Sequence, residues 1–430
     1  MSVDISRSRT DRPGGRWWPA GADARRLLAA HLVSYAGTVL AAVGLPVLAF
    51  QLTGSAAHTA ALVGLGLVPY VVLGLPVATY TDRADRRAVM VVAESASAAL
   101  SASVGLAALA DRLTIGHLYL AVAGLGTAFV FFDAANFGAV PRVARDEGVG
   151  RYLARQWTLD ATMQVAGPVV TGAIVATAGA GVVPAVDAVT FGVSAVVLRR
   201  IEAPLRAAGP GGRLADRLAA GARFLWSNRV VRSLTLAGIG NSMTAGAVLG
   251  LLVPLSVDRL GLSDDDGRIA VLYTAGAVGG LAAARLLALL APRVRLTGLV
   301  AGALAAATVA AAALGAQRNL VGAAIAYGVV VVATQVVILN AITVRQRVTP
   351  DELQGRVNVL ARMVSVAGLP VGTVLAGLAV PAVGVGPTVA MAGAGTALAA
   401  ALVLLGPLRP ELRPRGDLDP AWVPRRLRTR

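Results

Sequence analysis

The sequence contains no cysteine, no lysine and only three histidines. Without cysteine the chain can form no disulfide and offers no thiol for catalysis or metal binding. Three histidines supply few ligands for any other transition-metal site, and a chain without lysine cannot form a Walker-type ATP-binding loop. No His-Glu-x-x-His motif occurs, nor a Gly-x-Ser-x-Gly elbow with catalytic partners. We therefore expect no enzyme activity, no catalytic residues, no metal and no cofactor.

Charged residues are also scarce. They form 14% of the chain, against about 25% in soluble proteins, while hydrophobic residues form 56%. The mean hydropathy of +0.70 leaves too little polar surface for soluble domains and too much apolar surface for a disordered chain. Aromatic residues are only 4%, whereas the 49 glycines favour close helix packing. These values predict an all-α polytopic membrane protein.

Arginine supplies all 39 basic residues, against 23 acidic ones, and the formal net charge is +16. In a soluble protein such an excess would suggest nucleic-acid binding. Here the arginines fall between apolar runs, so we expect them to contact the anionic headgroups of membrane lipids. A nucleic-acid partner is not expected.

Twelve apolar runs are long enough to cross a bilayer, which takes about 20 residues of α-helix. They lie at 28–51, 59–80, 88–110, 115–138, 156–178, 182–198, 233–256, 269–290, 296–315, 320–344, 357–380 and 387–405. Arginine is concentrated in alternate loops, among them 83–87, 142–155, 199–232 and 345–356. Because such loops stay in the cytoplasm, both termini are predicted there, in a multi-pass protein of the cell membrane.

A long basic linker divides these runs into two sets of six. The expected organisation is a cytoplasmic tail at 1–27 without the apolar core of a signal peptide, a bundle at 28–198, the linker at 199–232, a bundle at 233–406 and a basic tail at 407–430. One face of a short linker helix carries Leu214, Leu218, Ala222 and Leu225. Such a helix suits the membrane interface, and a solvated spacer is the alternative.

The two halves also resemble each other in sequence. Asp146-Glu147 and Gly150-Arg151 precede the fifth run, and Asp351-Glu352 and Gly355-Arg356 precede the eleventh. Two parallel six-helix repeats, related by an axis along the membrane normal, make up the major facilitator fold. The sequence therefore predicts that architecture, with twelve transmembrane helices in two six-helix pseudo-repeats.

The loop after the second run carries the charged motif Thr-Asp-Arg-Ala-Asp-Arg-Arg at 81–87. It resembles the signature loop of the major facilitator superfamily, Gly-x-x-x-Asp-Arg-x-Gly-Arg-Arg. The matching residues are Asp82, Arg83, Arg86 and Arg87, and the two glycines are replaced by Ala78 and Asp85. This form is similar to the exporter branch that contains the macrolide-efflux pumps and the enterobactin exporter.

The resemblance implies that the loop is a gate latch. The carboxylate of Asp82 would cap the N-terminus of the eleventh helix, where the helix dipole is positive. Arg86 or Arg87 would pair with a nearby acid, Asp133 or Asp146. The alternative is that these arginines only set the topology.

A second motif lies in the fifth run, where Gly167, Pro168 and Gly172 resemble the Gly-Pro motif of drug antiporters in this superfamily. Proline bends a helix because it lacks a backbone donor, and the glycines let a neighbouring helix approach closely. The resemblance implies export rather than import. Small-residue packing without a functional role is the alternative.

Ionisable residues inside membrane helices are functional candidates, because burying their charge is costly. Asp133 is the first candidate for proton coupling, since Phe129, Asp133 and Asn136 share one helical face. Glu94 is the second, with a simple ion pair as the alternative. Many drug antiporters of the superfamily carry an arginine in the fourth span, but no arginine occurs in the fourth run here. Many members of the exporter branch carry an acid after a glycine in the first span, but here Thr38 follows Gly37.

The remaining ionisable residues are assigned structural roles. Asp160 and Asp187 are expected to make helix-end contacts, and His31 is expected to be a packed residue. Arg362 lies near the end of a run, so its side chain is expected to reach the membrane interface.

Few polar residues are available to line a central cavity. The candidates are Tyr35, Thr38, Gln164, Asn241, Gln335 and Asn340. A largely apolar cavity suits an amphiphilic small molecule, although a hydrogen bond between helices is the alternative for each residue.

The hypothesis is an exporter that works by alternating access, driven by inward proton flow, with one chain sufficient as a monomer. An uptake permease of the same fold and a non-transporting scaffold or sensor are the alternatives.

Overall fold

The structure is a computed structural model that describes residues 18–19, 21–145, 148–206, 214–291, 293–294 and 296–405, without the side chains of 214–218 and 296–297. The predicted tail at 407–430, most of the tail at 1–27, and Asp146 lie outside the described residues. The elements are α1 (Ala22–Thr53), α2 (Ala56–Thr81), α3 (Arg86–Leu109), α4 (Ile115–Val143), α5 (Val149–Ala178), α6 (Val182–Arg199), α7 (Leu214–Ser227), α8 (Arg229–Gly250), α9 (Leu252–Asp258), η1 (Gly267–Ile269), α10 (Ala270–Leu290), α11 (Leu296–Ala316), α12 (Leu320–Val348), η2 (Asp351–Leu353), α13 (Gln354–Val366), α14 (Gly368–Val383), α15 (Val385–Ala392) and α16 (Ala394–Leu405).

Short polar side chains define where many of these helices begin. The side chains of Ser55, Asp85, Thr114, Asn228 and Asn319 accept hydrogen bonds from the first backbone amides of α2, α3, α4, α8 and α12. Proline inside α1, α2, α4 and α5 does not end these helices, because packing against neighbours compensates for the lost backbone bond.

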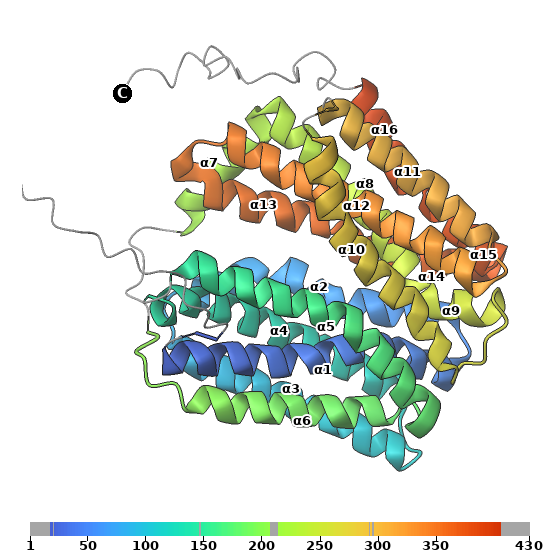
Figure 1. Cartoon of the computed structure of the whole chain (residues 1–430), viewed down its shortest axis with the longest axis horizontal. Coiled ribbons are helices and arrows are strands. Elements are labelled where there is room, and N and C mark those ends of the chain that lie inside the picture. Colours follow the sequence, from blue (N-terminus) through green and yellow to red (C-terminus); the bar gives the residue numbers. More distant parts are fainter. Residues whose placement is uncertain are drawn as a thin grey trace, which may run out of the picture.

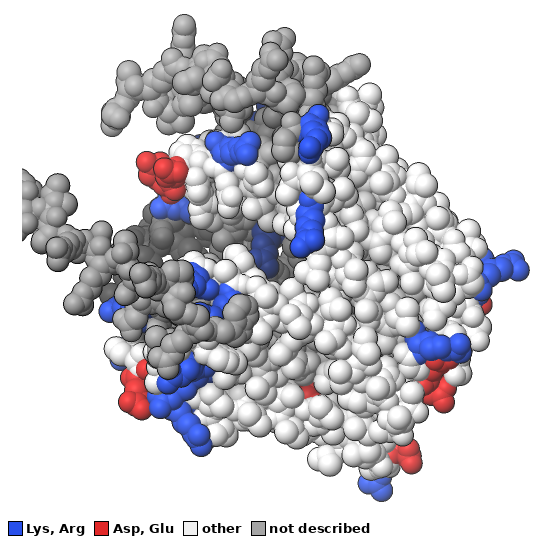
Figure 2. All heavy atoms as spheres, viewed as in Figure 1, with Lys and Arg blue, Asp and Glu red and all other residues white. Residues whose placement is uncertain are grey.

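The prediction of twelve spans is confirmed when one bent helix pair is counted as a span. In the described part of the chain, 11 helical segments are long and apolar enough to cross a membrane, and α8 with α9, bent by 46°, makes up to 12. The space-filling view shows a broad, largely uncharged surface between charged groups at opposite ends (Figure 2). The chain is therefore a multi-pass membrane protein.

Proline explains the interruptions in the seventh and eleventh runs, which the sequence analysis treated as continuous. Helix α8 ends at Gly250, four residues before Pro254, and α13 ends at Val366, four residues before Pro370. Proline has no N–H to bond the carbonyl four residues earlier, so the helical ladder is broken at each point.

The same helix pairings recur in the two halves. In the first, α1 packs on α5 and α6, α2 packs on α4, and α3 packs on α4 and α6. In the second, α8 packs on α14 and α16, α10 on α12, and α11 on α12, α15 and α16. Figure 1 shows the resulting pair of bundles, which meet through α2 on α14 and α5 on α10.

The two halves are joined at one end and separate toward the other. We call the end with the arginine-bearing α2–α3 and α10–α11 connections and the last turn of α12 the arginine-rich end. Among the described residues, apolar clusters that mix the halves, such as Ala60 with Leu251, lie toward the opposite end. At the arginine-rich end each half has its own cluster, around Met90 and Tyr152 or around Leu234 and Val357. In Figure 1 the bundles diverge toward α7 and meet near α9.

The linker helix predicted from its apolar face is present as α7. Its residue Leu225 is buried with Val357 and Ala361 of α13, so the helix packs on the arginine-rich end of the second half. Trp226 is 49% exposed. The predicted location in the membrane interface remains a prediction, and the side chains of Leu214 and Leu218 are outside the described set.

Because the chain has no cysteine of its own, paired cysteines can test which end is closed. A Cβ atom built at Gly377 lies 3.2 Å from that of Ala60, close to the separation that a disulfide needs. We expect Ala60→Cys with Gly377→Cys to cross-link rapidly in the purified protein, and Asp82→Cys with Asp351→Cys, at the arginine-rich end, to cross-link slowly. A protease site in the linker lets a gel separate uncross-linked halves. Equal rates for the two pairs would contradict the open end.

Candidate functional site

A cavity of about 380 Å³ lies inside the first half, between α1, α2, α3, α4 and α6. Its walls are mainly apolar, with Leu249 of α8 and Tyr273 of α10 as the contribution from the second half. The volume is in the range of sites for drug-sized ligands, about 300–1,000 Å³. The geometry can therefore enclose a hydrophobic or amphiphilic small molecule.

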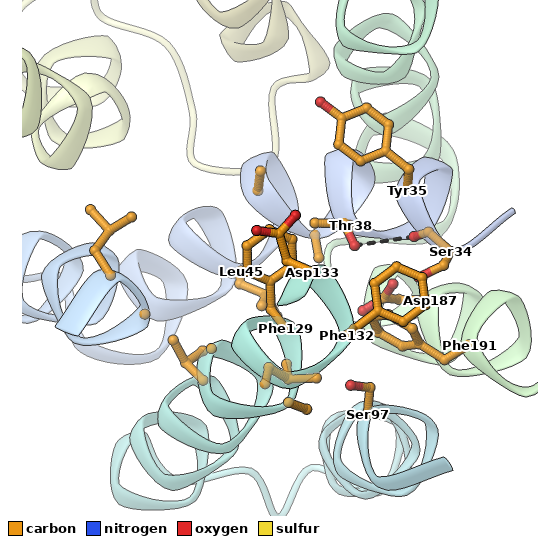
Figure 3. A pocket seen from close by; sticks show the side chains of 18 of the residues that line it. Ser34, Tyr35, Thr38, Leu45, Ser97, Phe129, Phe132, Asp133, Asp187 and Phe191 are labelled. Carbon is orange, nitrogen blue, oxygen red and sulfur yellow. Dashed lines mark hydrogen bonds between the residues drawn. The ribbon is translucent and has the colours of Figure 1, made fainter. Parts of the chain in front are cut away.

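Asp133 on α4 brings a carboxylate into this cavity. Figure 3 shows it pointing away from its helix, with Thr38 and Leu45 beside it and Phe129 one turn away. Of the predicted face, Phe129 and Asp133 line the cavity, whereas Asn136 is buried outside it. Asp133 is thus a polar group in otherwise apolar walls, as the sequence predicted.

Arg362, for which the membrane interface remains a prediction, makes a contact that was not expected from the sequence. Its guanidinium lies 5.3 Å from the centre of the Tyr70 ring, so α13 of one half contacts α2 of the other. Arg362 also acts electrostatically on Asp133, as does His31. A cationic side chain near the end of an apolar run was the only sequence signal at this position, and its contact with Tyr70 depends on how the two halves pack.

His31 and Asp160 form a contact that the sequence analysis also missed. His31 Nε2 lies 2.9 Å from Asp160 Oδ1, and the imidazole ring stacks between Tyr35 and Phe132. Asp160 lies in the middle of α5, so the predicted helix-end role is wrong. The pair joins α1 to α5 beside the cavity, which His31 lines.

Glu94 and Asp187 lie deeper in the same cavity. The hydroxyl of Ser34 on α1 donates to Glu94 Oε1 at 2.9 Å, and that of Ser101 on α3 donates to Asp187 Oδ2 at 2.9 Å. Asp187, expected to make a helix-end contact, instead faces the seam between α1, α3 and α6 (Figure 3). The simple ion pair considered for Glu94 is not found among the described residues.

The six predicted lining residues fall into two groups. Tyr35 and Thr38 line the cavity. Gln164 Nε2 donates to the Tyr35 hydroxyl at 2.8 Å, and Asn241 Nδ2 donates to the Thr334 carbonyl at 3.3 Å. Gln335 and Asn340 do not line the described cavity. A hydrogen bond between helices, the alternative weighed from the sequence, describes Gln164 and Asn241.

The charged loop is anchored within the first half. Arg86 Nη2 lies 3.6 Å from Asp82 Oδ1, and the buried guanidinium of Arg86 lies so close to Gly138 that any side chain there would collide with it. Arg87 Nη1 donates to the Ile201 carbonyl at 2.7 Å. The expected pairing of these arginines with Asp133 is therefore wrong. Within the described residues Asp82 has no bond to η2 or α13, so the predicted latch is not engaged at this open end.

The Gly-Pro motif of α5 lies at contacts made possible by its small residues. A side chain at Gly167 would collide with Val39 of α1, and one at Gly172 would collide with the Gly267 carbonyl of η1. Gly172 therefore brings α5 against the second half. The motif positions contribute packing, one of the two roles considered from the sequence.

These features define a membrane transporter built from two similar helical bundles, the first of which holds a cavity. The profile of the Major Facilitator Superfamily matches residues 27–365, and the chain belongs to this family, whose members are transporters and not enzymes. The chain is 31% identical over 224 residues to the multidrug efflux pump Tap of Mycobacterium tuberculosis and of Mycobacterium bovis. That match covers 48% of this chain and 52% of the pump, so it spans about half the length of these relatives.

Solved transporters share the fold at low sequence identity. The nucleoside transporter NupG has a TM-score of 0.74 at 10% identity, covering 89% of this chain and 98% of that one. An inward-facing, unoccupied bacterial homologue of the human lysosomal transporter Spinster has a TM-score of 0.69 at 16% identity, with 89% and 96% covered. An inward-facing bacterial homologue of the iron transporter ferroportin has 0.68 at 17%, with 89% and 98% covered.

Single cysteines can test whether the cavity is reached from the arginine-rich end. Thr38 lines the cavity, whereas Ala60 is fully buried where the halves join. We expect a polar maleimide to label Thr38→Cys much faster than Ala60→Cys, and a bulky hydrophobic ligand to slow the first reaction only. Mass spectrometry of the intact protein measures both rates. Equal rates would mean that the cavity is closed in solution.

Proposed function

We propose that this protein exports a hydrophobic or amphiphilic small molecule by alternating access. The observation that carries the proposal is the cavity itself, which has apolar walls, drug-like size and the Asp133 carboxylate inside it. The similarity to a multidrug efflux pump supports the direction, as does the Gly-Pro motif at Gly167, Pro168 and Gly172. Drugs, natural products and siderophore-like compounds belong to the proposed cargo class.

The proposed orientation places the arginine-rich end in the cytoplasm of a cell with the protein in its plasma or inner membrane. Retention of basic loops on the cytoplasmic side supports this orientation. In that setting the cavity faces inward, so that a molecule can enter from the cytoplasm or from the inner lipid leaflet. One chain holds both bundles, so a monomer suffices.

Export then requires the arginine-rich end to close and the opposite end to open. In our proposal the halves pivot about the α2–α14 and α5–α10 contacts. Asp82 then reaches the N-terminal end of the helix formed by η2 and α13, where amide groups and the helix dipole favour a carboxylate. Arg86, held against Gly138, keeps the loop in position for that contact.

Protons are the proposed energy source, with Asp133 and Glu94 as the candidate carriers. A carboxyl group in an apolar cavity can bind a proton in one conformation and release it in another, because its surroundings change as the halves rock. Asp133 points away from its helix into the cavity (Figure 3), whereas Glu94 is 2% exposed and bonded to Ser34. Asp133 is therefore the first residue to test.

The main test measures how much of a panel of fluorescent and antibiotic amphiphiles accumulates in an efflux-deficient bacterial host. We expect the wild-type chain to lower accumulation and a protonophore to abolish the effect. Asp133→Asn removes the titratable group at almost constant volume, so we expect it to raise accumulation to that of the host alone.

Asp265→Asn is the matched control, because it makes the same change at an exposed carboxylate outside the cavity, and we expect it to retain efflux. Membrane expression of each variant is quantified on the same cells. Full protonophore-sensitive efflux by Asp133→Asn at normal expression would exclude this carboxylate as the carrier.

Direction is tested in vesicles. Everted membrane vesicles have the cytoplasmic face outside. An acidic interior should therefore drive uptake of a fluorescent cargo in exchange for protons. Right-side-out vesicles have the cytoplasmic face inside, so an acidic external buffer should make them expel a preloaded cargo. Accumulation by right-side-out vesicles instead would indicate an uptake permease.

A further inference from the structure

A polar seam runs through the first half between α1, α3 and α6. Glu94, Ser97 and Ser101 recur on one face of α3, opposite Asp187 and Ser194 of α6 and Ser34 of α1. Glu94 is 2% exposed and Asp187 1% exposed, although both line the cavity. Figure 3 shows Ser34, Ser97 and Asp187 projecting into the same region. Two carboxyl groups are thus buried in a small space lined with hydroxyls.

Several oxygens in this seam are unpaired. Among the described atoms, Glu94 Oε2, Asp187 Oδ1 and the Ser194 hydroxyl have no hydrogen-bond partner. Ser194 is completely buried with its hydroxyl toward the Glu94 carboxyl, and the Thr190 hydroxyl lies toward that of Asp187. A Cβ atom at Gly37 of α1 would collide with Asp187 Oδ1 and with the Thr190 hydroxyl, so only glycine fits at this position. Buried polar atoms without partners are costly, and here three of them belong to one seam.

The two carboxyl groups have no positive partner in the described part of the chain. Glu94 and Asp187 act electrostatically on each other. The charged or titratable groups on neighbouring elements are His31 on α1 and Asp133 on α4, and His31 is paired with Asp160. Both carboxyl groups are buried in one seam of low dielectric, where two negative charges repel each other, so ionising both is unfavourable without a compensating cation.

We propose that Glu94 and Asp187 together form one binding site for a small monovalent cation, a proton or Na⁺. The unpaired oxygens supply the ligands, and Ser34, Ser97 and Ser194 supply hydroxyls of the kind that hard cations and shared protons require. A bound cation removes the repulsion between the carboxylates and lets α1, α3 and α6 pack. Its role in coupling rests on the proposed transport function, whereas its binding does not.

Infrared difference spectroscopy on the purified protein in lipid nanodiscs tests this site without any cargo. The carbonyl stretch of protonated carboxyl groups is recorded between acidic and alkaline buffers. A shared site predicts that Glu94→Gln and Asp187→Asn each change the band that remains from the other residue. Asp133→Asn, in the same cavity but outside the seam, should remove only its own band.

The occupant is identified by repeating the spectra at fixed pH with NaCl or, at matched ionic strength, with choline chloride. Loss of the protonated band on addition of Na⁺, absent from both single variants, assigns the site to Na⁺. Band changes that are non-additive but insensitive to Na⁺ assign it to a proton.

The proposal would be overturned if each single variant lost a separate band, the two losses summed to the loss in the Glu94→Gln, Asp187→Asn double variant, and Na⁺ had no effect on the spectra. Size-exclusion profiles and the Asp133→Asn spectrum establish that the variants are folded. Should the site bind a cation while the amphiphile panel shows no efflux, the proposed function fails and the cation site stands.

Discussion

Direct contact between backbones of the two halves determines where this molecule can open. Gly172 and Gly267 approach so closely that neither could carry a side chain, and the Thr373 side chain of α14 lies so close to Gly64 of α2 that Gly64 could not carry one. Side chains would hold the helices further apart, so these glycines let α5 and α2 pack against the second half at one end only. The parted arginine-rich end and its cavity follow from this arrangement, because at that end each half completes its own apolar cluster.

The membrane spans were predictable because their signal is local. A helix in lipid must satisfy its own backbone and present apolar side chains, so each span is a run that can be found without knowing its neighbours. The breaks after Gly250 and Val366 also had a local signal in Pro254 and Pro370, each four residues further on. The signal is ambiguous, because the prolines inside α1 and α5 interrupt neither helix.

The site was predictable only in part, because its contacts join residues far apart in the chain. That Asp133 faces a cavity could be inferred from its own helix. That His31 contacts Asp160, or that Arg362 reaches Tyr70, depends on how α1 meets α5 and how the halves meet. The family resemblance located the charged loop, yet the carbonyl of Ile201, which binds Arg87, belongs to a segment without a motif.

The carboxyl groups of the cavity differ in which neighbouring groups offset their negative charge. Near its open side, Asp133 interacts with His31 and with Arg362, so its charge has partners from both halves and depends on how far apart the halves are. Glu94 and Asp187 have partners only from α1, α3 and α6, and these partners are hydroxyls. A movement of one half against the other changes the field at Asp133 directly, since Arg362 moves with the second half. The same movement reaches the deeper pair only if α1, α3 or α6 shift among themselves. Two helices connect the sets: α1, which carries both His31 and Ser34 within one helical turn, and α4, which carries Asp133 and packs on α3.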